Sequence, residues 1–296
     1  MPVTRAQARH TRIPLAGGTQ ETLLSEVGPV LLPFFTTRDA CALRLVCREF
    51  LAAASEHPWE DRRTAIQGSI AAWRASFPRA RCANVGRFLY LGGAEVRSAR
   101  VYDADFVHFA GLRELNMAQC EDVTDAAFMH LRGIHALEMF GCSRITYAAF
   151  VHLAGIQRLG MFCCLGITDA AFVHLRGIQL LNIDHCEPLT DAAFVHLRGI
   201  KTLFVRHCKQ PAITDAAFVH LRGIRTLVLD YCSQATITGA TFSSLAGIEA
   251  LCMEGCSVEA IAAARALGLP VPAEGLGSLG YDCTYYPWPK PRAVPF

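Results

Sequence analysis

The chain has 296 residues, of which 52% are hydrophobic, so it is long enough to bury a substantial core. Its formal net charge of +2 at pH 7 argues against a protein that binds nucleic acid or a membrane surface. The N-terminus has no apolar signal region, no apolar run is long enough to span a membrane, and the 13 cysteines follow no export signal. We therefore expect reduced thiols and an intracellular protein, cytoplasmic or nuclear.

Three segments precede the main pattern of the sequence. Residues 1–20 are polar and basic, and we expect them to be disordered. Residues 21–62 are expected to form a small helical domain, because apolar residues recur there at steps of three and four. That apolar face consists of Leu43, Val46, Cys47, Phe50 and Leu51. Residues 63–84 contain a further amphipathic stretch, which we expect to end before Pro78 and to cap the first unit of the array that follows.

A nearly verbatim repeat, Ile-Thr-Asp-Ala-Ala-Phe-Val-His-Leu-Arg-Gly-Ile, dominates residues 85–268. Its phenylalanine recurs at Phe106, Phe128, Phe150, Phe172, Phe194, Phe218 and Phe242. A period in this range predicts an α/β solenoid, in which each unit buries its apolar face by stacking on its neighbours. Such an array offers a surface and no enclosed pocket, which favours binding of another macromolecule.

Each repeat unit is predicted to contain one strand and one short helix. In residues 136–140 the alternation directs Leu137 and Met139 inward. Helix N-caps are expected at Thr124, Thr168, Thr190 and Thr214, and left-handed C-caps at Gly133, Gly177, Gly199 and Gly223. The periodicity ends near residue 269, and residues 269–296 form a tail rich in proline and aromatic residues that either covers the last unit or is free.

The unit pattern, Leu-x-x-Leu-x-Met-x-x-Cys followed by Ile-Thr-Asp-Ala-Ala-Phe, resembles the cysteine-containing class of leucine-rich repeats. The marker cysteines are Cys120, Cys142, Cys164, Cys186, Cys208, Cys232 and Cys256. Most units are shorter than is usual for that class. The resemblance implies that the cysteines pack in the core. The alternative is that the cysteines form a metal-binding or redox-active column. The histidine that recurs in six of the helices could likewise bind a metal, but a row of solvated histidines is favoured there.

The segment before the repeats resembles an F-box. Leu43-Arg44-Leu45-Val46-Cys47-Arg48-Glu49-Phe50 and the later Trp59 match the second half of that motif, whereas Gly28-Pro29 departs from its first helix. The resemblance implies that the segment docks a Skp-type adaptor and, through it, a cullin. The implied adaptor contacts are Leu31, Leu32, Leu43, Val46, Cys47, Phe50 and Trp59.

An F-box joined to such repeats looks like the non-catalytic receptor subunit of an SCF-type ubiquitin ligase, whose strand-lined concave face holds an unknown target protein. Outward strand positions vary most between units, and exposed aromatic residues beside arginine are typical of binding hot spots. The candidate target contacts are Phe140, Arg158, Phe162, Asp184, His185, Phe204, Arg206, His207, Asp230 and Tyr231. The alternative is a repeat scaffold with the F-box-like segment as its cap. Neither hypothesis requires catalysis, a cofactor or a metal.

Overall fold

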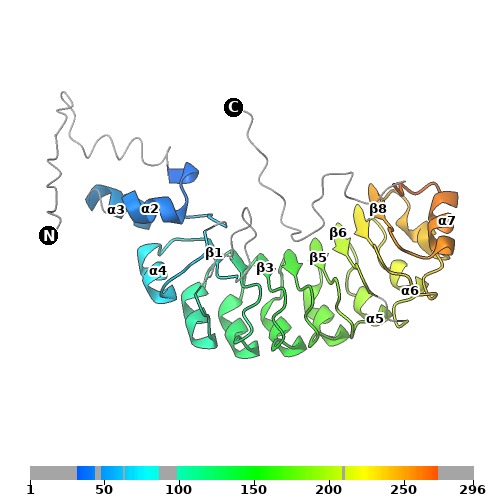
Figure 1. Ribbon diagram of the computed structural model, residues 1–296, viewed down its shortest axis with the longest axis horizontal. Coiled ribbons are helices and arrows are strands. Elements are labelled where there is room, and N and C mark those ends of the chain that lie inside the picture. The colour runs from blue at the N-terminus through cyan, green and yellow to red at the C-terminus, as the bar shows by residue number, and fades with distance from the viewer. Residues whose placement is uncertain (1–31, 44–47, 63, 87–98, 209–210, 273–296) are drawn as a thin grey trace, which may run out of the picture.

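The computed structural model describes residues 32–43, 48–62, 64–86, 99–208 and 211–272. Its main element is one sheet of eight parallel strands, each paired with its neighbours along the chain. Figure 1 shows the strands along the inner side of an arc and the short helices along the outer side. The strands are β1 (Cys82–Asn84), β2 (Glu114–Asn116), β3 (Ala136–Glu138), β4 (Arg158–Gly160), β5 (Leu180–Asn182), β6 (Thr202–Phe204), β7 (Thr226–Val228) and β8 (Ala250–Cys252). The predicted leucine-rich-repeat solenoid is confirmed.

A single apolar core runs through all the coils, from Ile66 to Ala264. The middle residue of each strand from β2 to β8 is a leucine that points into this core and pairs in register with the leucines of the neighbouring strands. All seven repeat phenylalanines are fully buried, as the repeat predicts. Each coil therefore completes the core of the next one, so the stability of the array depends on stacking.

The outer side of the arc is built mostly from 3-10 turns. These are η2 (Asp103–Phe109), η3 (Asp125–Leu131), η4 (Tyr147–His152), η5 (Asp169–Leu175) and η6 (Phe242–Leu245), with single α-turns at α5 (Asp191–Phe194) and α6 (Asp215–Phe218). The short helix predicted for each coil is thus present, in most coils as a 3-10 helix. A 3-10 turn rises about 2.0 Å per residue against 1.5 Å in an α-helix, so it spans the coil with fewer residues, as a short repeat requires.

An aspartate–threonine ladder links the outer turns of successive coils. The carboxylate of Asp191, for example, accepts hydrogen bonds from the backbone N–H of Thr214 at 2.8 Å and from its hydroxyl at 2.6 Å. The same two bonds join four further pairs: Asp103–Thr124, Asp125–Thr146, Asp169–Thr190 and Asp215–Thr238. Because each bond crosses between coils, the ladder fixes their stacking as well as their caps.

The predicted caps are confirmed with one exception. The side chains of Thr124, Thr190 and Thr214 accept the expected backbone N–H, whereas Thr168 makes no such bond. Tyr147 stands where the other coils carry the aspartate that would bond Thr168. The predicted C-cap glycines all have positive φ, between 80° and 86°. One rung of the ladder is therefore missing between η4 and η5.

The N-terminal helices form a small cluster that is continuous with the sheet. They are η1 (Leu32–Phe34), α2 (Thr37–Leu43), α3 (Arg48–Glu56) and α4 (Ile70–Ser76). Their cluster buries Leu32, Trp59 and Phe77. The carbonyl of Trp59 accepts backbone bonds from Arg81 and Cys82 at the start of β1. The backbone before β1 thus extends the hydrogen bonding of the array toward the helices.

The domain boundaries differ slightly from those expected. The first strand, β1, lies inside residues 63–84, so the sheet begins before the predicted start at residue 85. The apolar face predicted across Leu43 to Leu51 spans the end of α2 and the start of α3, and residues 44–47 lie outside the described part of the chain. Helix α7 (Val258–Ala266) covers the last coil with Ala260 and Ala264. Within the described residues, no helix has the length and apolar character that crossing a membrane requires.

Candidate interaction surface on the concave face

Side chains on the inner side of the arc form parallel rows. The first row comes from the first residue of each strand, the second from the third residue of each strand, and the third from the residue two positions after the strand ends. In β4, for example, Arg158 and Gly160 face inward from the arc while Leu159 enters the core. Because parallel strands lie about 4.8 Å apart, residues of one row are direct neighbours across coils. The rows therefore join side chains that are 22 or 24 residues apart in sequence into one continuous surface.

The residues that immediately precede the marker cysteines form a fourth row, and their backbone is left-handed in every coil from β2 to β8. Its residues and φ angles are Gln119 at 58°, Gly141 at 66°, Cys163 at 57°, His185 at 55°, His207 at 56°, Tyr231 at 62° and Gly255 at 67°. Glycine adopts this conformation freely, whereas other residues are strained there by roughly 1–2 kcal/mol. Five of the seven coils nevertheless keep a side chain at this position.

Five rings from the last two rows form a continuous ladder along the face. The rings of Phe140 and Phe162 stack with centroids 4.7 Å apart, and Phe162 meets His185 edge-on at 5.1 Å. His185 then stacks on His207 at 4.4 Å, and His207 stacks on Tyr231 at 4.7 Å. Tyr231 is the most open of the five, with 41% of its surface exposed. The structure thus joins five of the ten predicted target contacts into one ribbon of rings.

Carboxylates accompany the ring ladder at the C-terminal end of the face. Asp184 accepts hydrogen bonds from the backbone N–H of Arg206 at 2.6 Å and from its guanidinium at 2.7 and 2.8 Å. Asp230 accepts the backbone N–H of Glu254, and the hydroxyl of Tyr231 donates to Glu254 at 2.7 Å. Burial raises the pKa of Asp230. Asp184 and Asp230 were expected on an exposed surface, and their burial corrects this: the bonds they accept hold them beneath it.

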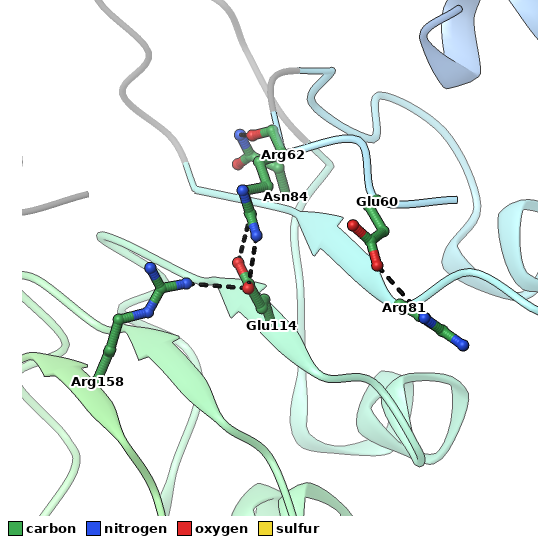
Figure 2. A network of polar contacts seen from close by, with 6 residues as sticks. All are labelled: Glu60, Arg62, Arg81, Asn84, Glu114 and Arg158. Atoms are coloured by element: carbon green, nitrogen blue, oxygen red, sulfur yellow. Dashed lines mark hydrogen bonds and ion pairs between the residues drawn. The ribbon is translucent and has the colours of Figure 1, made fainter. Parts of the chain in front are cut away.

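Three charged residues meet at the other end of the face, around β2. Glu114 lies on the first row, and its carboxylate bonds Arg62 from the helical segment and Arg158 from β4, as Figure 2 shows. Nη2 of Arg62 and Nη2 of Arg158 reach the same oxygen, at 2.7 and 2.9 Å. The residue between Glu114 and Arg158 in the register is Ala136, which is small enough to let Arg158 reach across. Arg158, one of the predicted target contacts, is therefore held by Glu114, two strands away on the same face.

A buried glutamate lies next to this group. Glu138 ends β3 on the third-residue row, where burial raises its pKa to about 8. A side chain at the neighbouring Gly160 would collide with the Glu138 carboxyl group, so the glycine is what makes room for it. At neutral pH Glu138 is therefore mainly uncharged and adds little negative charge to the face.

The marker cysteines are structural. Each sulfur donates to a backbone carbonyl of the preceding coil, for example Cys164 to Met139 at 3.2 Å and Cys186 to Met161 at 3.1 Å. Burial raises the pKa of Cys186 and of Cys208 to about 12, so the thiolate form that metals and oxidants need is disfavoured. No group of three metal-binding side chains gathers within the described residues. The hypothesis that the column packs in the core is confirmed.

The repeated histidines of the outer turns are half-buried and stand one per coil. They are His108, His130, His152, His174, His196 and His220. The guanidinium of Arg132 donates to the ring of His152 at 3.3 Å, which shows contact between neighbouring coils.

The predicted adaptor contacts are only partly within the described residues. Leu31, Val46 and Cys47 lie outside them, and Leu43 ends α2. Leu32 and Trp59 are 3% and 1% exposed, and the indole of Trp59 donates to the carbonyl of Ala54 at 2.6 Å. Their side chains hold the helical cluster together, so any adaptor surface has to come from their neighbours. Phe50 is half-buried and Leu51 is 46% exposed.

Three features were missed at the level of sequence. The left-handed row has no composition signal, although glycine at Gly141 and Gly255 beside histidine and tyrosine at the same position hints at it. The pairing of Arg62 with Glu114 joins residues far apart in sequence. The aspartate–threonine ladder was visible as a repeated Thr-Asp pair, but only the intracoil cap was inferred from it.

No protein-family model matches the chain, and no curated protein matches it. Similar solved structures include the complex of TLR13 with ssRNA13, at 15% identity and a TM-score of 0.48, covering 65% of this chain and 31% of that one. The Toll–Spatzle complex of Drosophila matches at 13% identity and a TM-score of 0.45, covering 70% of this chain and 31% of that one. The yeast Rad7–Elc1 complex matches at 18% identity and a TM-score of 0.39, covering 48% of this chain and 42% of that one. This chain thus spans less than half the length of each, and likenesses this remote assign no function.

Proposed function

We propose that the protein is the non-catalytic target receptor of an SCF-type ubiquitin ligase, acting inside the cell. In this proposal the helical segment docks a Skp-type adaptor that leads to a cullin, and the concave face holds the target protein. The receptor acts by proximity, because it raises the effective concentration of the target at a conjugating enzyme that it does not itself touch.

The observation that carries the proposal is the row of rings held in left-handed backbone. His185, His207 and Tyr231 occupy a position where glycine would remove the strain, as Gly141 and Gly255 do in other coils. Residues held in strained backbone of this kind cluster at functional sites. Since these rings stack into a ladder along the face, they support a binding surface for another macromolecule.

The proposed role of the helical segment rests on its sequence and on its place. The run from Leu43 to Phe50 matches the second half of an F-box, and α2 and α3 stand at the N-terminal end of the array (Figure 1). The Trp59 carbonyl and the Arg62 side chain both bond to the sheet or its first residues. A target on the concave face would therefore keep a fixed position relative to the adaptor.

The first test is a pull-down of the full-length protein with a purified Skp-type adaptor. Val46→Asp places a charge in the F-box-like run and should abolish binding. Val219→Asp is the matched control, because Val219 is 45% exposed on an outer turn at the far end of the array and should leave binding unchanged. Failure of the wild-type chain to bind the adaptor would overturn the receptor proposal.

One observation favours a second function, a repeat scaffold whose helical segment is only a cap. Leu32, Trp59 and Phe77 share one buried cluster, and the backbone of Trp59 bonds directly to the strand edge, as a capping element would. In that case the wild-type protein would not bind the adaptor. Val46→Asp would also leave the binding of partners to the concave face unchanged. The pull-down therefore separates the two functions.

A further inference from the structure

The described part of the chain ends beside the last coil of the array. After α7, the backbone N–H of Leu269 donates to the carbonyl of Ala264 at 3.0 Å, and Val271 packs against the core. Residues 273–296 follow and lie outside the described residues. The first 12 of them, 273–284, can span up to about 40 Å. Eight strands about 4.8 Å apart cover only about 34 Å, so the residues after 284 can reach any strand of the sheet.

The run that follows residue 284 has the composition of a polyproline II segment. Residues 285–294 read Tyr-Tyr-Pro-Trp-Pro-Lys-Pro-Arg-Ala-Val. A polyproline II helix repeats every three residues, which is a rise of about 9.3 Å. The residues that this repeat places on one side are all apolar or aromatic: Tyr285, Trp288, Pro291 and Val294. The two basic residues of the run, Lys290 and Arg292, fall on the other sides.

The ring ladder of the concave face has a matching spacing. Two coils of the array rise about 9.6 Å, so every third residue of such a segment would meet the same place two coils further along. Tyr231 is 41% exposed, and the other four rings are half-buried. Beside them, Phe204 packs with Val228 and Cys252 in a small apolar cluster apart from the main core. Aromatic-lined surfaces of this kind are the usual partners of polyproline II segments.

The exposed charges beside the ladder complement those of the run. Burial lowers the pKa of His185, and the carboxylates of Asp184 and Glu187 oppose this, which places Glu187 near the rings. Glu187 and Glu254 are both exposed, and Glu254 accepts the hydroxyl at the end of the ladder at 2.7 Å. Arg206, a cation of this region, is bonded to Asp184. The two basic residues of the run therefore have carboxylates to meet at this end of the face.

We propose that residues 285–294 bind along the ring ladder of their own chain, with Trp288 against the rings of His207 and Tyr231. The proposal rests on the proposed role of the concave face, because it makes the tail an internal competitor that a target has to displace. A tethered segment of this length is present at an effective concentration on the order of millimolar. Only a target that binds more tightly than the tail would then occupy the face.

Fluorine NMR of the full-length protein labelled with 5-fluorotryptophan tests the contact. The chain has three tryptophans, and Trp288→Phe identifies the signal of Trp288. In the wild-type protein this signal should differ from that of a synthetic peptide of residues 281–296 free in solution. In Tyr231→Gly and in His207→Gly it should shift to the free-peptide position. Glycine suits the left-handed backbone at both places, so the coil keeps its conformation.

Gln119→Gly is the matched control for these two variants. Gln119 has the same left-handed backbone, with φ of 58°, but lies outside the ring ladder, so the Trp288 signal should not move. A Trp288 signal at the free-peptide position in the wild-type protein, or one that moves equally in the control, would refute the contact. A signal that changes with protein concentration would also refute it, because a second copy would then supply the tail.

The same peptide, added to the intact chain, gives a second readout. It should bind Trp288→Ala at least about tenfold more tightly than the wild-type protein, in which the tethered tail already occupies the ladder. Equal binding to the two proteins would contradict the proposal. Adaptor binding is assigned to the helices at the opposite end of the array, so a failure here leaves the pull-down result, and with it the receptor proposal, unaffected.

Discussion

The outer side of the coils repeats the same residues from coil to coil, whereas the inner side varies. On the outer side the same Asp–Thr bonds recur in five places with nearly the same distances. On the inner side, equivalent positions carry Phe140, Asp184 or Arg206 on the same backbone. Since both sides rest on one continuous core, the difference shows that stacking is secured by the outer side, which leaves the inner side free to vary.

Breaking one rung of the outer ladder should have the largest effect on stability. Asp191→Ala removes the two hydrogen bonds to Thr214 and leaves a backbone N–H without its partner. We expect the free energy of unfolding to fall by about 2–3 kcal/mol, measured by urea denaturation. Tyr147→Ala is the control, because Tyr147 occupies the same place without a threonine partner and should cost much less. Equal losses would show that the ladder does not fix the stacking.

On the inner side, Glu138 should make stability depend on pH. Its pKa is raised from 4.5 to about 8 in the folded chain, so the folded state binds a proton that the unfolded state has released. Stability should therefore fall as the pH rises from about 4.5 to 8, by up to about 1.4 kcal/mol per pH unit. Glu138→Gln should remove this dependence and raise the melting temperature at pH 8. An unchanged pH profile in the variant would contradict the raised pKa.

Adding the missing Asp–Thr bond should change the stability by less than removing an existing one. Tyr147→Asp should supply the carboxylate that Thr168 lacks and stabilise the chain by about 1 kcal/mol. Ala148→Asp places the same charge one residue further along, in an exposed position that the ladder does not use, and should bring no gain. Thermal unfolding of both variants compares them directly. If the two behave alike, the benefit comes from charge near the turn and not from the rung.

The sequence was informative where one coil repeats another. The spacing of Phe128, Phe150 and Phe172 sufficed to predict the solenoid, and the glycines at the ends of the turns predicted their left-handed caps. The 3-10 geometry was not predicted, because the same Asp-Ala-Ala-Phe run suits an α-turn and, in α5 and α6, forms one. Local propensity does not separate the two when the turn is this short.

The site was less predictable than the fold, since its key contacts cross between coils. Phe140 and Tyr231 were selected as exposed aromatic residues, but nothing local shows that four ring contacts, three stacked and one edge-on, connect them. Likewise Asp184 was expected at the surface, and only the bond from Arg206 in the next coil explains its burial. Arg62 was outside the predicted contacts altogether, because its partner Glu114 belongs to a different segment.

The smallest expected effect on stability comes from the inner face, and it sharpens the comparison most. Tyr231→Phe removes only the hydroxyl that donates to Glu254 and keeps the ring that stacks on His207. Because this hydrogen bond is exposed, we expect the urea denaturation curve of the variant to coincide with that of the wild-type protein. A loss comparable to that of Asp191→Ala would mean that the inner face also holds the coils together. Its variation between coils would then need an explanation other than binding.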